Sequence, residues 1–295
     1  MSISEEQVRN EVRAWLEENW SPNLDLVEWR LKLADSGWGM ANWPAEWYGR
    51  DLPVSLVPAI DEEFNRIGAL TIPKSGIRML AAATILNHGS DMHKEKFLKR
   101  IITGEDVWCQ LFSEPGSGSD LAGATTKAVM VGNKWVVNGQ KVWCSGGRYS
   151  NWGILMARTD PNLPKHRGIS FFLIDMHSDG IETRPLRQMT GEAEFDEVFF
   201  TDVSLPQTAL LGPLNGGWHV GMDILTKERG SIGAGAITMQ RRLDSLQSLA
   251  NKELSHDKRQ QLAQLLIKGK SYHYLGQRQG PAASVSSSLN KFVKK

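Results

Sequence analysis

The chain has 295 residues, of which 41% are hydrophobic and 23% are charged, and its formal net charge is +1. This composition indicates a soluble globular protein of two or three modest domains, and so small a net charge favours neither nucleic acid nor an anionic membrane as a partner. No stretch approaches the roughly 18 apolar residues of a membrane-spanning helix, and no apolar leader follows a basic start, so we expect a cytoplasmic protein.

Residues 1–105 predict a helical domain. Apolar residues recur at steps of three and four along this stretch, with charged residues between them. Glycines that follow Ser36 and His88, and Pro58 near the start of a segment, agree with helix ends and starts. The segments are EEQVRNEVRAWLEENW, LDLVEWRLKLADSGW, PAIDEEFNRIGA, MLAAATILNHG and MHKEKFLKRIITGE.

The pattern changes at residue 106, and residues 106–205 predict a compact β domain, either a barrel or a sandwich. Short runs rich in aromatic and β-branched residues alternate with turn residues. In KWVVNGQKVWCSG, the pair Asn138-Gly139 predicts the turn of a β-hairpin. Four further runs follow: NWGILMAR, GISFFLID, IETRPLRQM and FDEVFFTDVSLP.

Helical periodicity returns after Gly216-Gly217 and lasts to the end, so residues 206–295 predict a truncated C-terminal helical domain. The order of helices, β-strands and helices predicts an α+β multidomain protein whose last part is an incomplete helical bundle.

The cysteines and histidines predict no metal site. Cys109 and Cys144 both stand in apolar, strand-like contexts, so we expect small core residues rather than a disulfide framework or zinc ligands. His88 and His93 are five residues apart, which differs from the one-turn spacing of a zinc pair.

The glycine-rich stretch KERGSIGAG, residues 227–235, admits two interpretations. A phosphate-binding loop would need a strand, a tight glycine turn and then a helix. Here the preceding WHVGMDILTKER already has a helical pattern, and the glycines follow G-x-x-G-x-G rather than G-x-G-x-x-G. The stretch is therefore predicted to be helical.

On that helix, Glu228 projects toward the apolar stripe formed by Leu225, Ile232, Leu243 and other residues. A carboxylate on a buried face costs free energy unless it is paired, hydrogen-bonded or protonated. From helical position alone, a structural ion pair is the simpler explanation and a catalytic base is the sharper one.

A second cluster, WCQLFSEPGSGSDLAG, spans residues 108–123 between the helical and β domains. Its single proline, its glycines and its short polar residues predict a turn with free N–H groups that an anion or a carbonyl oxygen could use. Downstream, Trp143 and Ser145 are two apart and share one face of a predicted strand, which suits a flat, hydrogen-bonding ligand. Core packing with a solvated serine is the alternative.

At this point the sequence resembles a known family. The segments CQLFSEPGSGSDLAG, WVVNGQKVWCSGG, GILMARTDP, KHRGISFFLIDM, RPLRQMTG, FDEVFFTDVSLP and GPLNGGW are similar, in this order, to those of acyl-CoA dehydrogenases, and the likeness covers about residues 10–290. The resemblance implies an FAD enzyme that oxidises the Cα–Cβ bond of an acyl-CoA thioester. It also implies an electron-transfer flavoprotein as electron acceptor and a homo- or hetero-oligomer.

The resemblance further implies site residues. Residues 110–119 would clasp the flavin, with backbone contacts from Phe112 and Ser113, and Ser119 would reach the cofactor or the CoA phosphates. Trp143 would cover one flavin face, and Ser145 would donate a hydrogen bond near its reactive nitrogen. The implied FAD contacts are Gln110, Phe112, Ser113, Gly118, Ser119, Trp143 and Ser145.

The pair Glu228-Arg229 matches family members of the isovaleryl and long-chain type, which place the catalytic base immediately before an arginine. The resemblance thus favours Glu228 as the general base and Arg229 as a substrate contact. It also favours a long, branched or bulky acyl group, for which the small residues beside Glu228 would leave room.

Two features depart from the family pattern. Family chains continue through further helices beyond Lys295, and NKELSHDKRQQLAQLL lacks the Arg-Gln-Phe-Gly type of segment that contacts a neighbouring subunit's flavin. The alternatives are therefore a non-catalytic or partner-dependent subunit of a heteromer and a truncated, inactive paralogue. Another flavin chemistry on the same fold is a further alternative, against which Glu228 counts.

Overall fold

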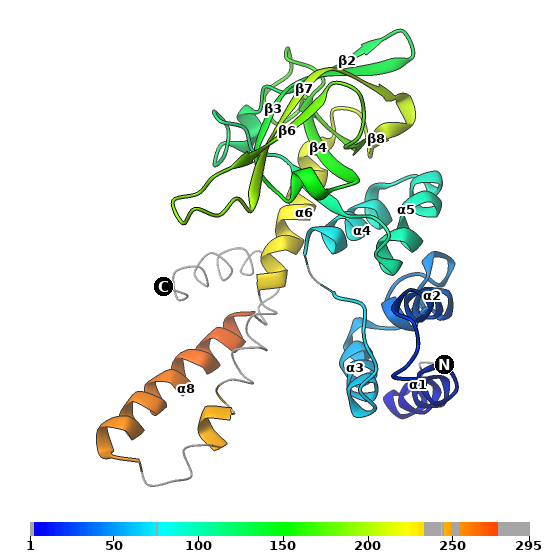
Figure 1. The fold of residues 1–295 in the computed structure, drawn as a ribbon, viewed down its shortest axis with the longest axis vertical. Coiled ribbons are helices and arrows are strands. Elements are labelled where there is room, and N and C mark those ends of the chain that lie inside the picture. Colours follow the sequence, from blue (N-terminus) through cyan, green and yellow to red (C-terminus); the bar gives the residue numbers. More distant parts are fainter. Residues whose placement is uncertain (1–2, 75, 233–242, 244, 249–253, 277–295) are drawn as a thin grey trace. The chain divides into compact units, whose positions relative to one another are not determined.

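The computed structural model describes residues 3–74, 76–232, 243, 245–248 and 254–276. The chain divides into two compact units, residues 1–221 and residues 222–295, and each is described by itself. The first unit contains the N-terminal helices and one β-sheet, and the second contains the later turns of α6 together with α8 (Figure 1).

The N-terminal helices overlap the predicted segments, although some of their ends differ by a few residues. Ser4 caps the first helix by accepting a hydrogen bond from the Gln7 backbone N–H. Gly37 and Gly104 end the second and fifth helices in the left-handed conformation, at φ 73° and 82°. The helices are α1 (Glu5–Asn19), α2 (Leu26–Ser36), α3 (Val57–Arg66), α4 (Ile77–His88) and α5 (Asp91–Thr103).

A charge cluster joins α1 to α3. The buried carboxylate of Glu63 lies 2.7 Å from a guanidinium nitrogen of Arg13, 2.9 Å from Arg66 and 3.3 Å from Arg9. The hydrogen bond from Arg13 is the largest of the effects that lower the pKa of Glu63 to about 2, and burial opposes the change. Glu63 is therefore ionised at neutral pH although it is buried.

All strands of the described residues belong to one sheet in the order β6-β7-β3-β2-β4-β5-β8, with β1 paired to β4. The pairings are antiparallel except for β1 with β4 and the single contact of β2 with β4. The strands are β1 (Trp108–Leu111), β2 (Lys127–Val131), β3 (Lys134–Ser145), β4 (Trp152–Arg158), β5 (Ile169–Asp175), β6 (Ile181–Leu186), β7 (Phe195–Pro206) and β8 (Leu210–Leu211).

The sheet curves around its own core. Trp135 of β3 and Phe172 of β5 meet edge to face with ring centroids 5.3 Å apart, although β2 and β4 separate their strands in the sheet order. Cys109 and Cys144 lie fully buried in the same cluster and are free thiols, which confirms their prediction as core residues. The helical and β parts confirm the predicted fold class.

The predicted hairpin at Asn138-Gly139 is wrong. β3 runs without interruption from Lys134 to Ser145, and the pair lies at a register shift against β7. Gly139 has φ 150°, and a Cβ there would meet Thr126 Oγ1 at 2.5 Å. The glycine is therefore needed for a β-bulge and for close approach of another backbone, a second use of the signal that a turn also gives.

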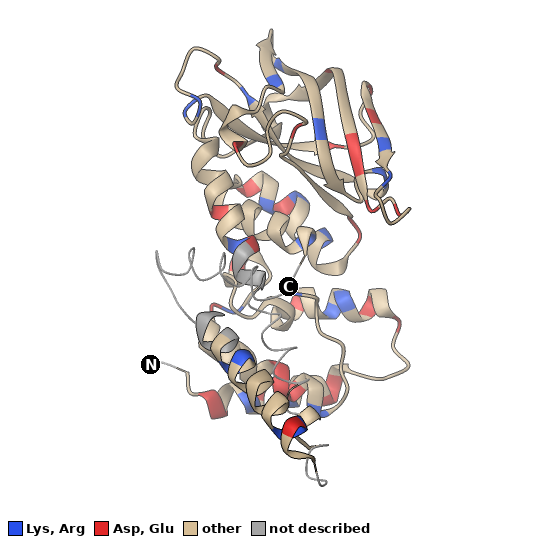
Figure 2. Ribbon diagram, turned by 90° about the vertical axis from the view of Figure 1, so that its left-hand side faces the viewer, with Lys and Arg blue, Asp and Glu red and all other residues tan. Residues whose placement is uncertain are grey.

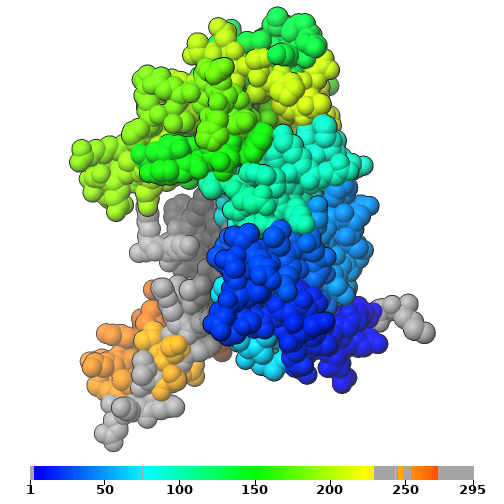
Figure 3. All heavy atoms as spheres, turned by 45° about the vertical axis from the view of Figure 1, so that its right-hand side comes forward, coloured from blue at the N-terminus to red at the C-terminus, as the bar shows by residue number. Residues whose placement is uncertain are grey.

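Helices α4 and α5 pack against the sheet within the first unit (Figure 3). Phe97 of α5 contacts the rings of Trp108 in β1 and Trp152 in β4, with centroids 5.3 and 4.7 Å away. These aromatic contacts hold the middle of α5 against the start of β1 and of β4.

Helix α6 (Gly217–Ile232) contains Lys227 to Ile232, which confirms the helical prediction for this part of KERGSIGAG. Residues 233–235 lie outside the described residues. In the second unit, Gly269 of α8 (His256–Gly276) lies so close to Leu243 that a Cβ would overlap that side chain. Within the described ranges, no helix is both long and apolar enough to cross a bilayer.

Candidate functional site

The loop after β1 is closed by a tight turn at Pro115-Gly116. The Glu114 N–H donates to the Ser117 carbonyl at 2.9 Å, and the Ser117 N–H donates back at 3.0 Å. Gly118 and Ser119 follow and are exposed. In the described part of the chain, their backbone N–H groups and the Ser119 hydroxyl make no hydrogen bond, so these donors face solvent or a ligand.

A buried ion pair anchors this loop. The Lys141 ammonium, which is fully buried, lies 2.8 Å from Glu114 Oε1 and donates to the Phe112 carbonyl at 3.0 Å. Glu114 also accepts hydrogen bonds from the backbone N–H groups of Thr125 and Thr126 at 2.7 and 2.9 Å. Neither Glu114 nor Lys141 is among the site residues predicted from the sequence.

Burial opposes ionisation of both partners, since it lowers the pKa of Lys141 and raises that of Glu114. For Glu114 the effects of Lys141 and the two backbone N–H groups outweigh burial and lower its pKa to about 2. The only sequence signal for this pair was a lysine among the apolar residues of a predicted core strand.

The second predicted segment lies on a distorted part of β3. The register against β7 shifts between Lys141 and Cys144, and Trp143 within this shift has φ 62°. The Trp143 side chain is 57% exposed, while Cys144 is buried and Ser145 is partly buried. One edge contact, to Phe195 at 5.7 Å, leaves indole surface open to a flat ligand.

The structure brings these two segments together. The Val142 N–H donates to the Ser113 carbonyl at 2.8 Å, so the loop after β1 lies directly beside the Trp143 bulge. Phe112 is buried against Phe171, with ring centroids 5.1 Å apart. Gln110 is partly buried at the end of β1.

These residues fit a flat ring that accepts hydrogen bonds. Trp143 offers an open aromatic face, and the Ser113 and Ser145 hydroxyls make no hydrogen bond elsewhere within the described ranges. The isoalloxazine of FAD has these properties, because it is a planar heterocycle with nitrogens and carbonyl oxygens on its rim.

Glu228 lies on α6 and is partly buried. It is four residues after Ile224, which is 1% exposed, so the two side chains share one face of the helix. The next helical position carries Arg229, whose side chain lies outside the described residues. Glu228 belongs to the second unit and the Trp143 segment to the first.

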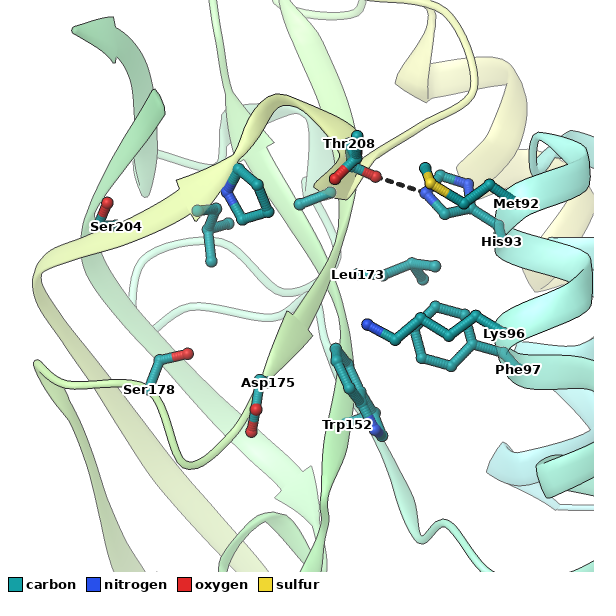
Figure 4. Close-up of a pocket in the computed structure, with 13 residues that line it drawn as sticks. Met92, His93, Lys96, Phe97, Trp152, Leu173, Asp175, Ser178, Ser204 and Thr208 are labelled. Atoms are coloured by element: carbon teal, nitrogen blue, oxygen red, sulfur yellow. Dashed lines mark hydrogen bonds between the residues drawn. The ribbon is translucent and has the colours of Figure 1, made fainter. Parts of the chain in front are cut away.

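Two hollows in the first unit are lined by other residues than these. A hollow of about 150 Å³ between α5 and the sheet has an apolar floor that includes Leu173, with Lys96 over the ring of Trp152 (Figure 4). Another, of about 470 Å³, lies beside Lys165 and Arg158. Arg158 donates to several carbonyls there, including that of Lys165 at 2.7 Å, and so fixes the loop.

Positively and negatively charged residues are interspersed over the helices and strands (Figure 2). Among the described residues, no cluster of three or more histidines, cysteines or carboxylates is arranged to hold a metal ion.

Comparison with known proteins gives matches along most of the chain. Residues 2–105 match the acyl-CoA dehydrogenase N-terminal domain, and residues 109–203 match the middle domain of the same family. Acyl-CoA dehydrogenase FadE34 of Mycobacterium tuberculosis is 40% identical over 81% of this chain and 33% of its own length. Acyl-CoA dehydrogenase IpdE1 of the same organism is 35% identical over 85% of this chain and 70% of its own length.

Solved structures of acyl-CoA dehydrogenases have the same fold as this chain. The Tcur3481-Tcur3483 steroid ACAD superposes with a TM-score of 0.70 at 25% identity, over 98% of this chain and 77% of that one. The ChsE4-ChsE5 complex from Mycobacterium tuberculosis gives 0.68 at 26% identity, over 99% and 82%. The chain thus spans about a third of the length of FadE34 and most of the length of IpdE1. It belongs to the acyl-CoA dehydrogenase family.

Proposed function

We propose that the chain takes part in the FAD-dependent α,β-dehydrogenation of an acyl-CoA thioester. The observation that carries this proposal is the placement of the Ser113 loop beside the Trp143 bulge, joined by the hydrogen bond from Val142 to Ser113. Two segments far apart in the sequence thereby lie side by side, one with an open indole face and both with unused hydrogen-bonding groups.

In this proposal, Trp143 covers one face of the flavin, and the hydroxyl of Ser145 donates to its rim. The loop contributes Gln110, Phe112, Ser113, Gly118 and Ser119. Rigid placement matters because a misplaced donor loses most of its effect on a developing charge. When bound, FAD supplies the oxidising power of the reaction by accepting a hydride from Cβ of the acyl group.

Glu228 acts as the general base. Its carboxylate takes the proton from Cα and becomes a carboxylic acid, while the electron pair of the broken C–H bond forms the Cα–Cβ double bond as the hydride leaves Cβ. Negative charge that develops on the thioester oxygen during this step requires hydrogen-bond donors. Arg229 is proposed to contact the substrate, and Ser119 to reach the cofactor or the CoA phosphates.

The acyl group is proposed to be bulky or branched, and an electron-transfer flavoprotein is the proposed electron acceptor. Similarity to the steroid ACAD Tcur3481-Tcur3483 supports a bulky group. A site built for a large rigid acyl group gains little binding free energy from a short straight chain, since the apolar area that it buries is small.

The test is the visible spectrum of the flavin-loaded protein during titration with a panel of acyl-CoAs from short straight chains to steroid side chains. We expect reduction by bulky thioesters, and we expect Glu228→Gln to reduce its rate by about 10²–10⁴-fold, the usual contribution of a positioned base. The control is Lys227→Gln on the same helix, which breaks only the ion pair with Asp223.

Equal reduction rates in wild type and Glu228→Gln would remove Glu228 as the base. A rate that peaks sharply at short straight chains would contradict the bulky substrate.

A second candidate is a partner-dependent subunit. The solved relatives Tcur3481-Tcur3483 and ChsE4-ChsE5 carry two names each, and the latter is described as a complex. We therefore propose that a second acyl-CoA dehydrogenase chain assembles with this one and completes its FAD site.

A further inference from the structure

We propose that Lys141 is a positioning residue that holds the Phe112 carbonyl and the start of the Trp143 bulge in one fixed arrangement, and so presents the Ser113 N–H to FAD. The inference rests on the proposed function for the identity of the ligand. The anchoring itself follows from contacts of Lys141 that do not involve a ligand.

Lys141 fixes the peptide between Phe112 and Ser113. Lys141 Nζ donates to the Phe112 carbonyl at 3.0 Å, which fixes the direction of that carbonyl. Because a trans peptide is planar, its N–H points opposite to its C=O. The Ser113 N–H is therefore directed away from Lys141, and it makes no hydrogen bond within the described ranges.

The next peptide of the loop, between Ser113 and Glu114, is also held by β3. The Ser113 carbonyl accepts from the Val142 N–H at 2.8 Å, and Val142 directly follows Lys141. Two consecutive peptides of the loop are thus held by two consecutive residues of β3. A slip of one segment against the other would break both hydrogen bonds together.

Lys141 also stands at the start of the Trp143 bulge. Lys141 is the last residue paired with β7 before the register shift, and Trp143 lies within that shift at φ 62°. A side chain anchored at Lys141 determines where the shift begins, and therefore where the indole of Trp143 lies relative to the loop.

The charge of the pair also needs explaining. Replacing a buried ion pair by apolar residues of similar volume is often neutral or stabilising, so stability alone does not call for Lys141 and Glu114. An ammonium held by a carboxylate that is itself held by Thr125 and Thr126 has a fixed direction, which an apolar side chain lacks. We infer that direction at the Phe112 carbonyl is what the pair provides.

The experiment separates positioning from stability. Lys141→Met alone leaves the buried carboxylate of Glu114 without its cation and is expected to lower Tm. In the double variant Lys141→Met/Glu114→Gln both charges are gone. The Gln oxygen can accept from one of the two backbone N–H groups that Glu114 binds through separate oxygens, so Tm is expected to recover in part. The protection of the Val142 N–H against hydrogen exchange and the affinity for FAD are expected to stay below their wild-type values.

Two readouts apply to the full chain. Hydrogen exchange of the ligand-free double variant should be faster in peptides that contain Val142, with other strands unchanged. FAD dissociation constants should rise about tenfold, the equivalent of one lost directional hydrogen bond. The matched control is Glu182→Gln/Arg184→Met, which removes an exposed ion pair on β6 and should leave both readouts at wild-type values.

Unchanged exchange at Val142 in the double variant, or FAD affinity that recovers together with Tm, would overturn the inference. If the wild-type chain takes up no FAD under any condition, the proposed function fails instead. In that case the exchange measurement alone supports or overturns the anchoring by Lys141.

Discussion

Glu63 and Glu114 are buried carboxylates that stay ionised because cations and N–H donors surround them. The sequence could not show this, because Arg9, Arg13 and Arg66 occur at positions that an amphipathic helix gives to solvent-facing charges. Whether such a charge is solvated or paired depends on which helices meet, and that is set by tertiary packing.

The cluster around Glu63 predicts a pH dependence. Its pKa is lowered from 4.5 to about 2, so the folded state binds its proton more weakly than the unfolded state. The stabilisation is therefore fully present above about pH 4.5 and is lost as pH falls from there toward 2. Glu63→Gln should lower Tm at pH 7 and lose less Tm than wild type between pH 5 and about 3.

Thermal unfolding across this pH range measures the effect. Glu62→Gln is the control, because Glu62 is exposed and contacts Arg9 alone among these arginines. A Glu63→Gln curve parallel to that of wild type would show that the arginines do not hold the pKa of Glu63 low.

At the scale of elements, sequence patterns predicted the N-terminal helices and the runs that became β4 to β7. Helix caps such as Gly37 and Gly104 are local signals, so they could be recognised without the fold. The bulge in β3 could not be predicted, since the pair Asn138-Gly139 is typical both of a hairpin turn and of a bulge. Only pairing with β7 across the whole strand distinguishes them.

The bulge makes a prediction about Gly139. Its φ of 150° disfavours any side chain, and a Cβ would approach the Thr126 Cα within 2.7 Å. Gly139→Ala should therefore lower the free energy of unfolding by about 2 kcal/mol or more, measured by urea denaturation. Gly132→Ala is the matched control, because Gly132 has φ 61° but no atom within 4 Å of the position that a Cβ would take, and should cost about 1 kcal/mol.

Equal losses at the two glycines would mean that backbone conformation alone, and not close packing on Thr126, explains the requirement for Gly139.

At the scale of the whole molecule, the order of helical, β and helical parts followed from periodicity alone, because the period changes from 3.6 to 2 and back. The candidate site followed from periodicity only in part. Trp143 and Ser145 are both more exposed than Cys144 between them, in keeping with a shared side of β3, but their proximity to Ser113 depends on a hydrogen bond between distant segments. The buried contacts that hold this arrangement, Glu114 and Lys141, gave almost no local signal.

The last prediction concerns assembly. If a second chain completes the FAD site, the purified chain should bind FAD weakly by itself, because part of the cofactor's contacts is supplied in trans. Adding the second chain should lower the FAD dissociation constant, since each further directional hydrogen bond contributes about 0.5–1.5 kcal/mol. Flavin absorbance of the chain alone and of the co-purified pair, with native mass spectrometry for composition, measures this. Full flavin occupancy with turnover in the isolated chain would exclude the partner requirement and leave the simpler proposal, in which this chain alone carries the site.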